Sequence, residues 1–165
     1  MTDTALTLHD IQPNSDGERV LSRTKHGWER ADSETTGCRW VIVGDRTDLE
    51  DAARRHGVSE PALELLAHRG AGSHATSLDH PVRARLDRSP DEELVLTVPT
   101  LSYVEASRDV HTGAVTTVVG DGVVLTCELG DAGVIEMAVR KLTGGFPVPD
   151  DGEHQVLADG EIGEQ

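Results

Sequence analysis

The sequence predicts an α/β (α+β) domain, in which a mixed, largely antiparallel sheet is flanked by short helices. Residues 110–128 carry two runs rich in valine and threonine, joined by Gly120-Asp121-Gly122, which is typical of a β-hairpin. Residues 81–104 predict a second hairpin just before it. Apolar residues at helical spacing predict two helices before these four strands and one after them, so helices lie at both ends of an antiparallel run.

The start of the chain predicts little regular structure. Polar and turn-forming residues dominate residues 1–37, so we expect a poorly ordered or peripheral segment there. Residues 18–23 (ERVLSR) are an exception, because they are able to form a short strand. Residues 38–45 (CRWVIVGD) form a compact apolar run that ends in Gly-Asp, which predicts a buried strand.

Capping residues set the expected helix boundaries. Thr47 and Glu50 fit a capping box at the start of the first helix, and Gly57 ends it. Ser59 is the expected cap of a second helix over residues 60–68. Asp131 is the expected cap of a third helix over residues 132–142.

The first predicted hairpin contains one residue that constrains it. Residues 81–88 alternate apolar and polar side chains, which is the period of a strand, and residues 93–104 form the strand paired with it. Pro99 has no N–H to donate to a strand ladder, so we expect a bulge or an open edge at that point. Taken together, these elements place the folded domain at residues 38–146.

Composition excludes several classes of function. Fifteen basic against thirty acidic residues give a net charge of −15, which argues against binding to nucleic acid or anionic lipid. The charge is compatible with attracting divalent cations or with a solvated acidic surface. Residues 147–165 form an acidic tail that we expect to be disordered. The start has no signal-peptide pattern and no stretch approaches 18 apolar residues, so we expect a cytoplasmic protein without a membrane span.

The sequence carries no enzyme motif, and we expect no catalysis. No Gly-x-Gly-x-x-Gly follows a strand, there is no Gly-x-Ser-x-Gly, and neither Cys38 nor Cys127 has a neighbouring histidine. The histidines at 68, 74 and 80 bracket a polar loop that also contains Asp79. Their six-residue spacing differs from the tight pairs of zinc sites, which favours a solvated loop over a metal site.

Several short motifs occur in an order that resembles a known family. They are Trp40-Val41-Ile42-Val43, Arg83-Ala84-Arg85-Leu86-Asp87-Arg88, His111-Thr112-Gly113, Val118-Val119-Gly120 and Val123-Val124-Leu125-Thr126. The first is similar to the opening tryptophan strand of the cytosolic N-terminal domain of CorA-type magnesium transporters, the family that includes the ZntB zinc transporters. The second is similar to its Arg-Pro-Lys-Leu-Glu-Arg strand, and the last three resemble its Thr-Gly, Val-Gly and Val-Val-x-Thr hairpin. The resemblance covers roughly residues 39–142.

The resemblance implies a regulatory, funnel-forming domain beneath a pentameric pore, which senses divalent cations such as Mg²⁺ at subunit interfaces. Its implied partners are the transmembrane portion of a CorA-like transporter or further copies of the chain. The family's stalk helix, its two membrane helices and its Gly-x-Asn pore motif are absent from this sequence, so we expect a monomer or weak dimer. The family's metal-binding Asp corresponds to Leu65, which leaves Glu64 as the candidate metal ligand. One carboxylate is too few for a magnesium site made of protein ligands alone, and an ordinary exposed glutamate is the alternative.

These observations lead to one expected function and one alternative. The chain is expected to be a regulatory domain of the CorA type, without a pore or catalysis of its own. The alternative is a stand-alone acidic soluble protein that binds divalent metal or a protein partner. A small enzyme on an unrecognised scaffold is a third reading, which would require a deep pocket with converging polar groups.

Overall fold

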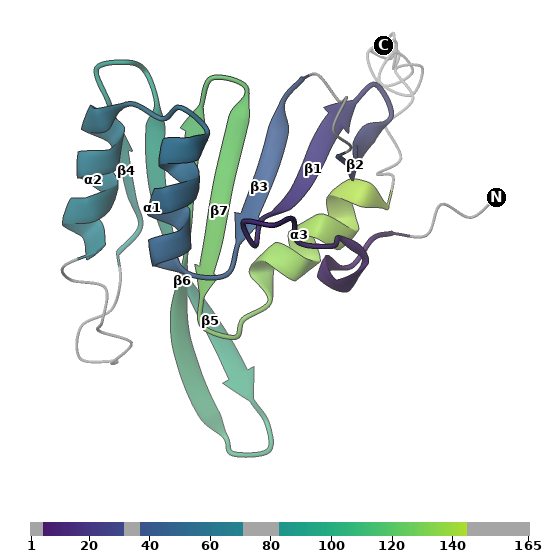
Figure 1. Ribbon diagram of the computed structural model, residues 1–165. Coiled ribbons are helices and arrows are strands. Elements are labelled where there is room, and N and C mark those ends of the chain that lie inside the picture. The colour runs from purple at the N-terminus through teal and green to yellow at the C-terminus, as the bar shows by residue number, and fades with distance from the viewer. Residues whose placement is uncertain (1–4, 32–36, 71–82, 145–165) are drawn as a thin grey trace, which may run out of the picture.

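The computed structural model describes residues 5–31, 37–70 and 83–144. It consists of one sheet and three α-helices, preceded by a short 3₁₀ turn (Figure 1). In chain order, the elements are η1 (Leu8–Asp10), β1 (Arg19–Thr24), β2 (Gly27–Arg30), β3 (Arg39–Val43), α1 (Arg46–Arg55), α2 (Glu60–Gly70), β4 (Arg85–Arg88), β5 (Leu94–Val104), β6 (Asp109–Gly120), β7 (Val123–Leu129) and α3 (Val134–Thr143).

The seven strands lie in the order β2-β1-β3-β7-β6-β5-β4. Among the described strands, β3 and β7 run parallel and every other neighbouring pair is antiparallel. The predicted fold class, a mixed and largely antiparallel sheet with flanking helices, is therefore confirmed. Each described helix is too short or too polar to cross a bilayer.

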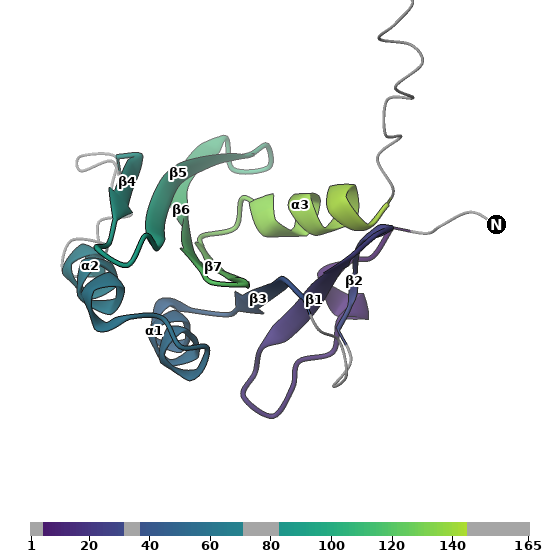
Figure 2. The same cartoon turned by 90° about the horizontal axis from the view of Figure 1, so that it is seen from above.

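The sheet is the middle of three layers, with α1 and α2 on one face and α3 on the other (Figure 2). Strand β3 explains why both faces are covered, because its side chains are buried on both sides. Val41 and Val43 belong to the core beneath α1 and α2, whereas Trp40 and Ile42 belong to the core beneath α3. The continuous apolar run at residues 39–43 is thus the signature of a strand enclosed on two faces.

The expectation for residues 1–37 needs correction where β1 and β2 lie. We expected a poorly ordered or peripheral segment, but β1 pairs directly with β3 and forms part of the sheet. Leu21 is fully buried beside Trp40, and the rings of Trp28 and Trp40 meet edge to face with centroids 6.0 Å apart. Residues 18–23 have only a weak strand pattern, and the strand is stabilised by burial against segments that are distant in the chain. Local composition carries no information on such burial.

Two of the predicted helix caps are also wrong. Helix α1 begins two residues earlier than the Thr47 box implies, because Asp45 is the N-cap and its side chain accepts a hydrogen bond from the Asp48 amide at 2.8 Å. Helix α3 has Gly133 in the N-cap position, and no side chain of that residue is available to cap it. Instead, Glu128 at the end of β7 accepts bonds from the first amides of α3, those of Val134 at 2.9 Å and Ile135 at 3.2 Å.

The two predicted hairpins are confirmed, with longer strands than expected in β6 and β7 and a shorter strand than expected in β4. β6 and β7 pair from Gly120↔Val123 to Ala114↔Leu129, and β4 and β5 pair from Arg88↔Leu94 to Arg85↔Thr97. Pro99 lies beyond the last described β4 pair and opposite Ala114 of β6. The proline therefore occupies the open edge of β5, where its missing N–H disrupts no described ladder.

Candidate functional site at the foot of the ribbon

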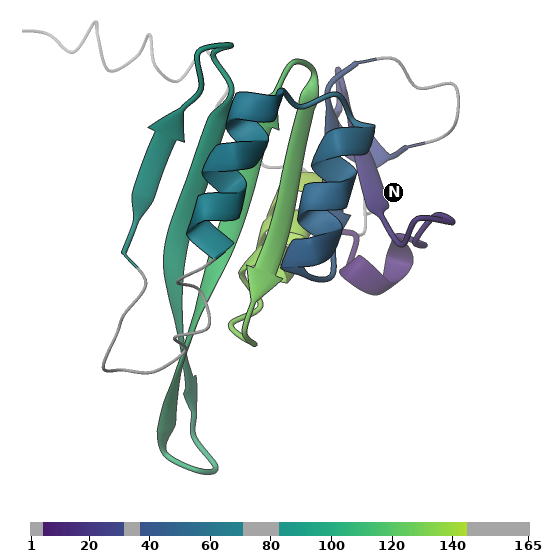
Figure 3. The ribbon, with the colours of Figure 1, turned by 60° about the vertical axis from the view of Figure 1, so that its left-hand side comes forward.

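A two-stranded ribbon projects from one end of the sheet (Figures 1 and 3). We define the ribbon as residues 98–113, which begin after the last β4 pair at Thr97 and end before the last β7 pair at Ala114. Within the ribbon, β5 and β6 pair with each other from Thr100↔Gly113 outwards to Val104↔Asp109. Among the described strands, none flanks the ribbon on either side.

Two glycines form the point where the ribbon leaves β7. A β carbon on Gly113 would lie 2.1 Å from the carbonyl oxygen of Leu129 and 2.9 Å from Thr100 Oγ1, so no larger residue fits without moving a strand. Gly130, the next residue after β7, has φ +101°, a conformation that residues with a side chain rarely adopt. We call Gly113 and Gly130 the neck of the ribbon.

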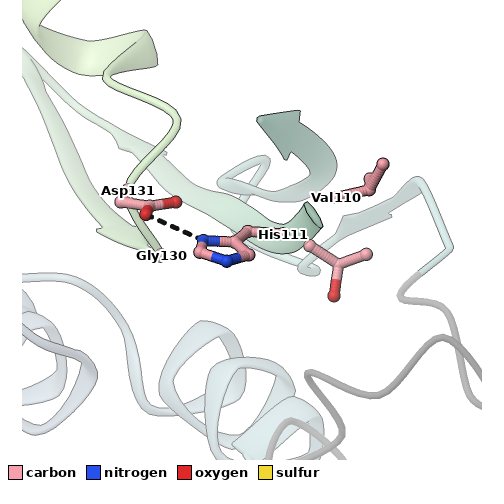
Figure 4. Close-up of a pocket in the computed structure, with 5 residues that line it drawn as sticks. Val110, His111, Gly130 and Asp131 are labelled. Atoms are coloured by element: carbon pink, nitrogen blue, oxygen red, sulfur yellow. Dashed lines mark hydrogen bonds and ion pairs between the residues drawn. The ribbon is translucent and has the colours of Figure 1, made fainter. Parts of the chain in front are cut away.

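Asp131 connects both ribbon strands to the segment that leads into α3. Figure 4 shows its contact with His111. Its Oδ1 accepts a hydrogen bond from Ser102 Oγ at 2.8 Å, and its Oδ2 lies 3.0 Å from His111 Nδ1. Ser102 on β5 and His111 on β6 are direct cross-strand partners, so their side chains share one face of the ribbon. One carboxylate therefore bridges the two strands, and Asp131 does this in place of the helix cap that the sequence predicted.

A shallow hollow of about 420 Å³ lies beside this contact, lined by Val110, His111, Thr112, Gly130 and Asp131. The hydrogen bond to His111, followed by that to Ser102, holds the pKa of Asp131 below its usual value, so the carboxylate is ionised at neutral pH. The hydroxyl of Ser102 donates to Asp131 and not to the imidazole. Because a base must contact the nucleophile to activate it, this arrangement lacks the Ser–His contact of a hydrolase.

The opposite face of the ribbon is apolar and exposed. Leu101 and Tyr103 are 70% and 62% exposed, and Val110, the cross-strand partner of Tyr103, is 47% exposed. Successive residues of a strand point to opposite faces, so these three side chains lie away from Ser102 and His111. The ribbon thus has one face fixed to the body of the domain and one face in solvent.

Among the residues that the structure describes, the predicted metal ligand belongs to no ligand cluster. Glu64 lies on an exposed position of α2, and the described residues contain no group of three or more His, Cys, Asp or Glu side chains that could hold a metal ion. His68 is exposed at the end of the same helix. His74, Asp79 and His80 lie outside the described residues.

A second polar cluster, centred on Glu18, was not predicted from the sequence. This side chain is only 3% exposed and contacts Arg55 Nη2 at 2.7 Å, His56 Nε2 at 3.2 Å and Asn14 Nδ2 at 3.3 Å. Burial opposes its ionisation, but the hydrogen bonds from Arg55, His56 and Asn14 outweigh burial and hold the pKa of Glu18 below its usual value. The cluster fixes the start of β1 to the end of α1, which is a structural role. Arg55 and His56 lie 37 and 38 residues from Glu18 in the chain, so no local motif predicts the cluster.

Two of the family-like motifs meet in the core. Trp40, from the tryptophan strand, donates from Nε1 to Oγ1 of Thr126, the threonine of the Val-Val-x-Thr motif, at 2.9 Å. Both residues are buried, at 6% exposure each. The Thr-Gly glycine, Gly113, is the neck residue that excludes a β carbon.

The fold and this site define an α+β domain with a projecting ribbon held by a surface carboxylate. The sequence matches no protein-family model and no curated protein. Among solved structures, the chain is similar to the cytoplasmic domain of ZntB from Vibrio parahaemolyticus, with a TM-score of 0.49 and 11% sequence identity. The similarity covers 76% of this chain and 50% of that chain, so the present chain spans about half the length of that structure.

Proposed function

We propose that this chain acts as a cytosolic regulatory domain of the CorA type and carries no catalysis. In this role it senses divalent cations and works together with the transmembrane portion of a transporter or with further copies of itself. The observation that carries the proposal is the buried contact between Trp40 and Thr126, because it joins two of the family-like motifs that lie 86 residues apart in the chain.

The proposal gains further support from the positions of the other motifs. Thr112-Gly113 and Val119-Gly120 lie on β6, and Val123-Val124-Leu125-Thr126 lies beside them on β7. Gly113 is required at its position because a β carbon would overlap the Leu129 carbonyl. These motif residues therefore lie together in one hairpin, as the family resemblance implies.

Glu64 remains a proposed ligand for Mg²⁺ in this function. It is exposed on α2, and a single carboxylate supplies too few oxygens for Mg²⁺, so the remaining ligands would be water or groups from a second copy. Glu64→Gln should then weaken Mg²⁺ binding measured by calorimetry, whereas Glu60→Gln, an exposed control on the same helix, should not. Equal Mg²⁺ affinities of the two variants and the parent would remove Glu64 from the proposal.

A chimera tests the regulatory role. Residues 38–146 would replace the corresponding segment of a CorA-type transporter, and Mg²⁺ entry into vesicles would be followed with a fluorescent indicator. We expect a pentamer whose uptake falls as Mg²⁺ on the cytosolic side rises. A correctly assembled pentamer with uptake that is independent of cytosolic Mg²⁺ would contradict a regulatory role.

The net charge of −15 favours one alternative, a stand-alone acidic protein that binds divalent metal or a protein partner. Calorimetry and thermal shift with Mg²⁺, Zn²⁺ and Ca²⁺ test its metal-binding version. Saturable heat in the isolated monomer supports it. An absence of both heat and thermal shift at millimolar metal would count against it.

A further inference from the structure

The ribbon lacks the lateral support that stabilises the rest of the sheet. Its strands pair only with each other over residues 98–104 and 109–113 within the described part of the chain. An isolated two-stranded hairpin is marginally stable in water, since it has no third strand or helix to pack against. Contacts at the point where the ribbon leaves the sheet must therefore set the direction of the ribbon.

Two described features lie where the ribbon leaves the sheet. At the neck, Gly113 has no side chain and lies close to the Leu129 carbonyl, so the backbones come together there. Above the neck, the carboxylate of Asp131 receives one hydrogen bond from each strand, from Ser102 and from His111.

Asp131 is itself firmly placed. It lies in the short segment 130–133 between β7 and α3. Glu128 on β7 connects the two ends of this segment, because its carboxylate accepts hydrogen bonds from the first amides of α3. The contact of Asp131 with the ribbon therefore couples the ribbon to the start of α3, which is packed on the sheet through Ile135 and Val139.

We propose that Asp131 is a clamp that fixes the direction of the ribbon, and that the ribbon swings about the Gly113–Gly130 neck when this clamp opens. The clamp is easily opened, because Asp131 and His111 are 59% and 47% exposed and water competes for both groups. A clamped and a released ribbon thus differ little in free energy, so a modest change at this contact shifts the balance between them. This inference does not depend on the proposed function, since its observations are internal to the chain.

Nuclear magnetic resonance on the full chain tests the clamp. Residual dipolar couplings of amides in residues 99–112 report the direction of the ribbon relative to β3, and hydrogen exchange reports its opening. In Asp131→Ala we expect ribbon couplings to shrink through averaging, and ribbon amides to exchange about three- to tenfold faster, while β3 stays unchanged. Asp121→Ala removes the same charge from the exposed β6–β7 turn and should change neither quantity.

Single-strand variants separate the clamp from a general loss of stability. Ser102→Ala and His111→Gln should each give an intermediate effect, and adding either change to Asp131→Ala should give little more. Unchanged ribbon couplings in Asp131→Ala would overturn the proposal. Equal acceleration of exchange in β3 and in the ribbon would also overturn it, because Asp131 would then stabilise the whole fold without directing the ribbon.

Discussion

Trp40 and Thr126 are joined by a buried hydrogen bond in which the indole Nε1 donates to the threonine Oγ1 at 2.9 Å. They lie on β3 and β7, the parallel pair at the centre of the sheet, on the face covered by α3. This bond connects the part of the sheet that precedes the helices α1 and α2 to the part that follows them. It also gives the Thr126 hydroxyl a partner within a strand whose other buried residues are Val123, Leu125 and Cys127.

Thr126→Val tests this bond. The substitution keeps the shape of the side chain but leaves the buried indole N–H without its acceptor, which costs about 1–3 kcal/mol. Urea unfolding followed by tryptophan fluorescence measures the change in the free energy of unfolding. Thr126→Ser keeps the hydroxyl and should lose less than Thr126→Val; the reverse order would show that the methyl group matters more than the bond.

Gly113→Ala should destabilise the fold by about 1–3 kcal/mol, because the new β carbon would overlap the Leu129 carbonyl and force β6 and β7 apart. Chemical denaturation gives the magnitude. Gly44→Ala is a matched control, since its β carbon would meet only Asp48 Oδ2 at an ordinary 3.9 Å. If the two variants are equally stable, the close contact at the neck is not a constraint.

Glu18 should make stability depend on pH in the acid range. Its pKa is lowered in the folded state, so its contribution is fully present above the unfolded pKa of about 4.3 and is lost as the pH falls through the lower folded value. Glu18→Gln should therefore be about 1–2 kcal/mol less stable than the parent at pH 7, and this gap should close as the pH falls below about 4. Urea unfolding at several pH values measures the gap. The exposed Glu29→Gln is the control, and a gap that is constant with pH would rule out ionisation of Glu18 as the cause.

The two cysteines should differ in reactivity. Burial, more than any charge, raises the pKa of the Cys127 thiol to about 11, whereas Cys38 is partly exposed. Because the thiolate is the reactive form, iodoacetamide at pH 8 should modify Cys38 first and Cys127 only on unfolding. Mass spectrometry of the modified peptides measures both rates. In Cys38→Ser, rapid modification of the native protein would contradict the burial of Cys127.

Local sequence patterns were sufficient wherever the cause of structure is local. The β6–β7 hairpin follows from valine and threonine on either side of Gly120-Asp121-Gly122, and α1 follows from apolar residues at Leu49, Ala52 and Ala53 that all pack on one face. Glu64 is exposed on α2, and its role as a metal ligand stays a prediction. In each case the pattern lies within a few residues of the structure that it forms.

Contacts between distant segments decided the rest. The cap of α3 comes from Glu128 on the preceding strand, the partners of Glu18 come from α1, and β1 exists as a strand because Leu21 is buried beside Trp40. Asp131 has the residue type of a helix cap, yet the ribbon brings Ser102 and His111 to it and gives it a different role. The physical reason is that helix and strand propensities depend only on residues that are close together in the sequence. The partner of a buried polar group or a weak strand is set by the topology of the whole sheet.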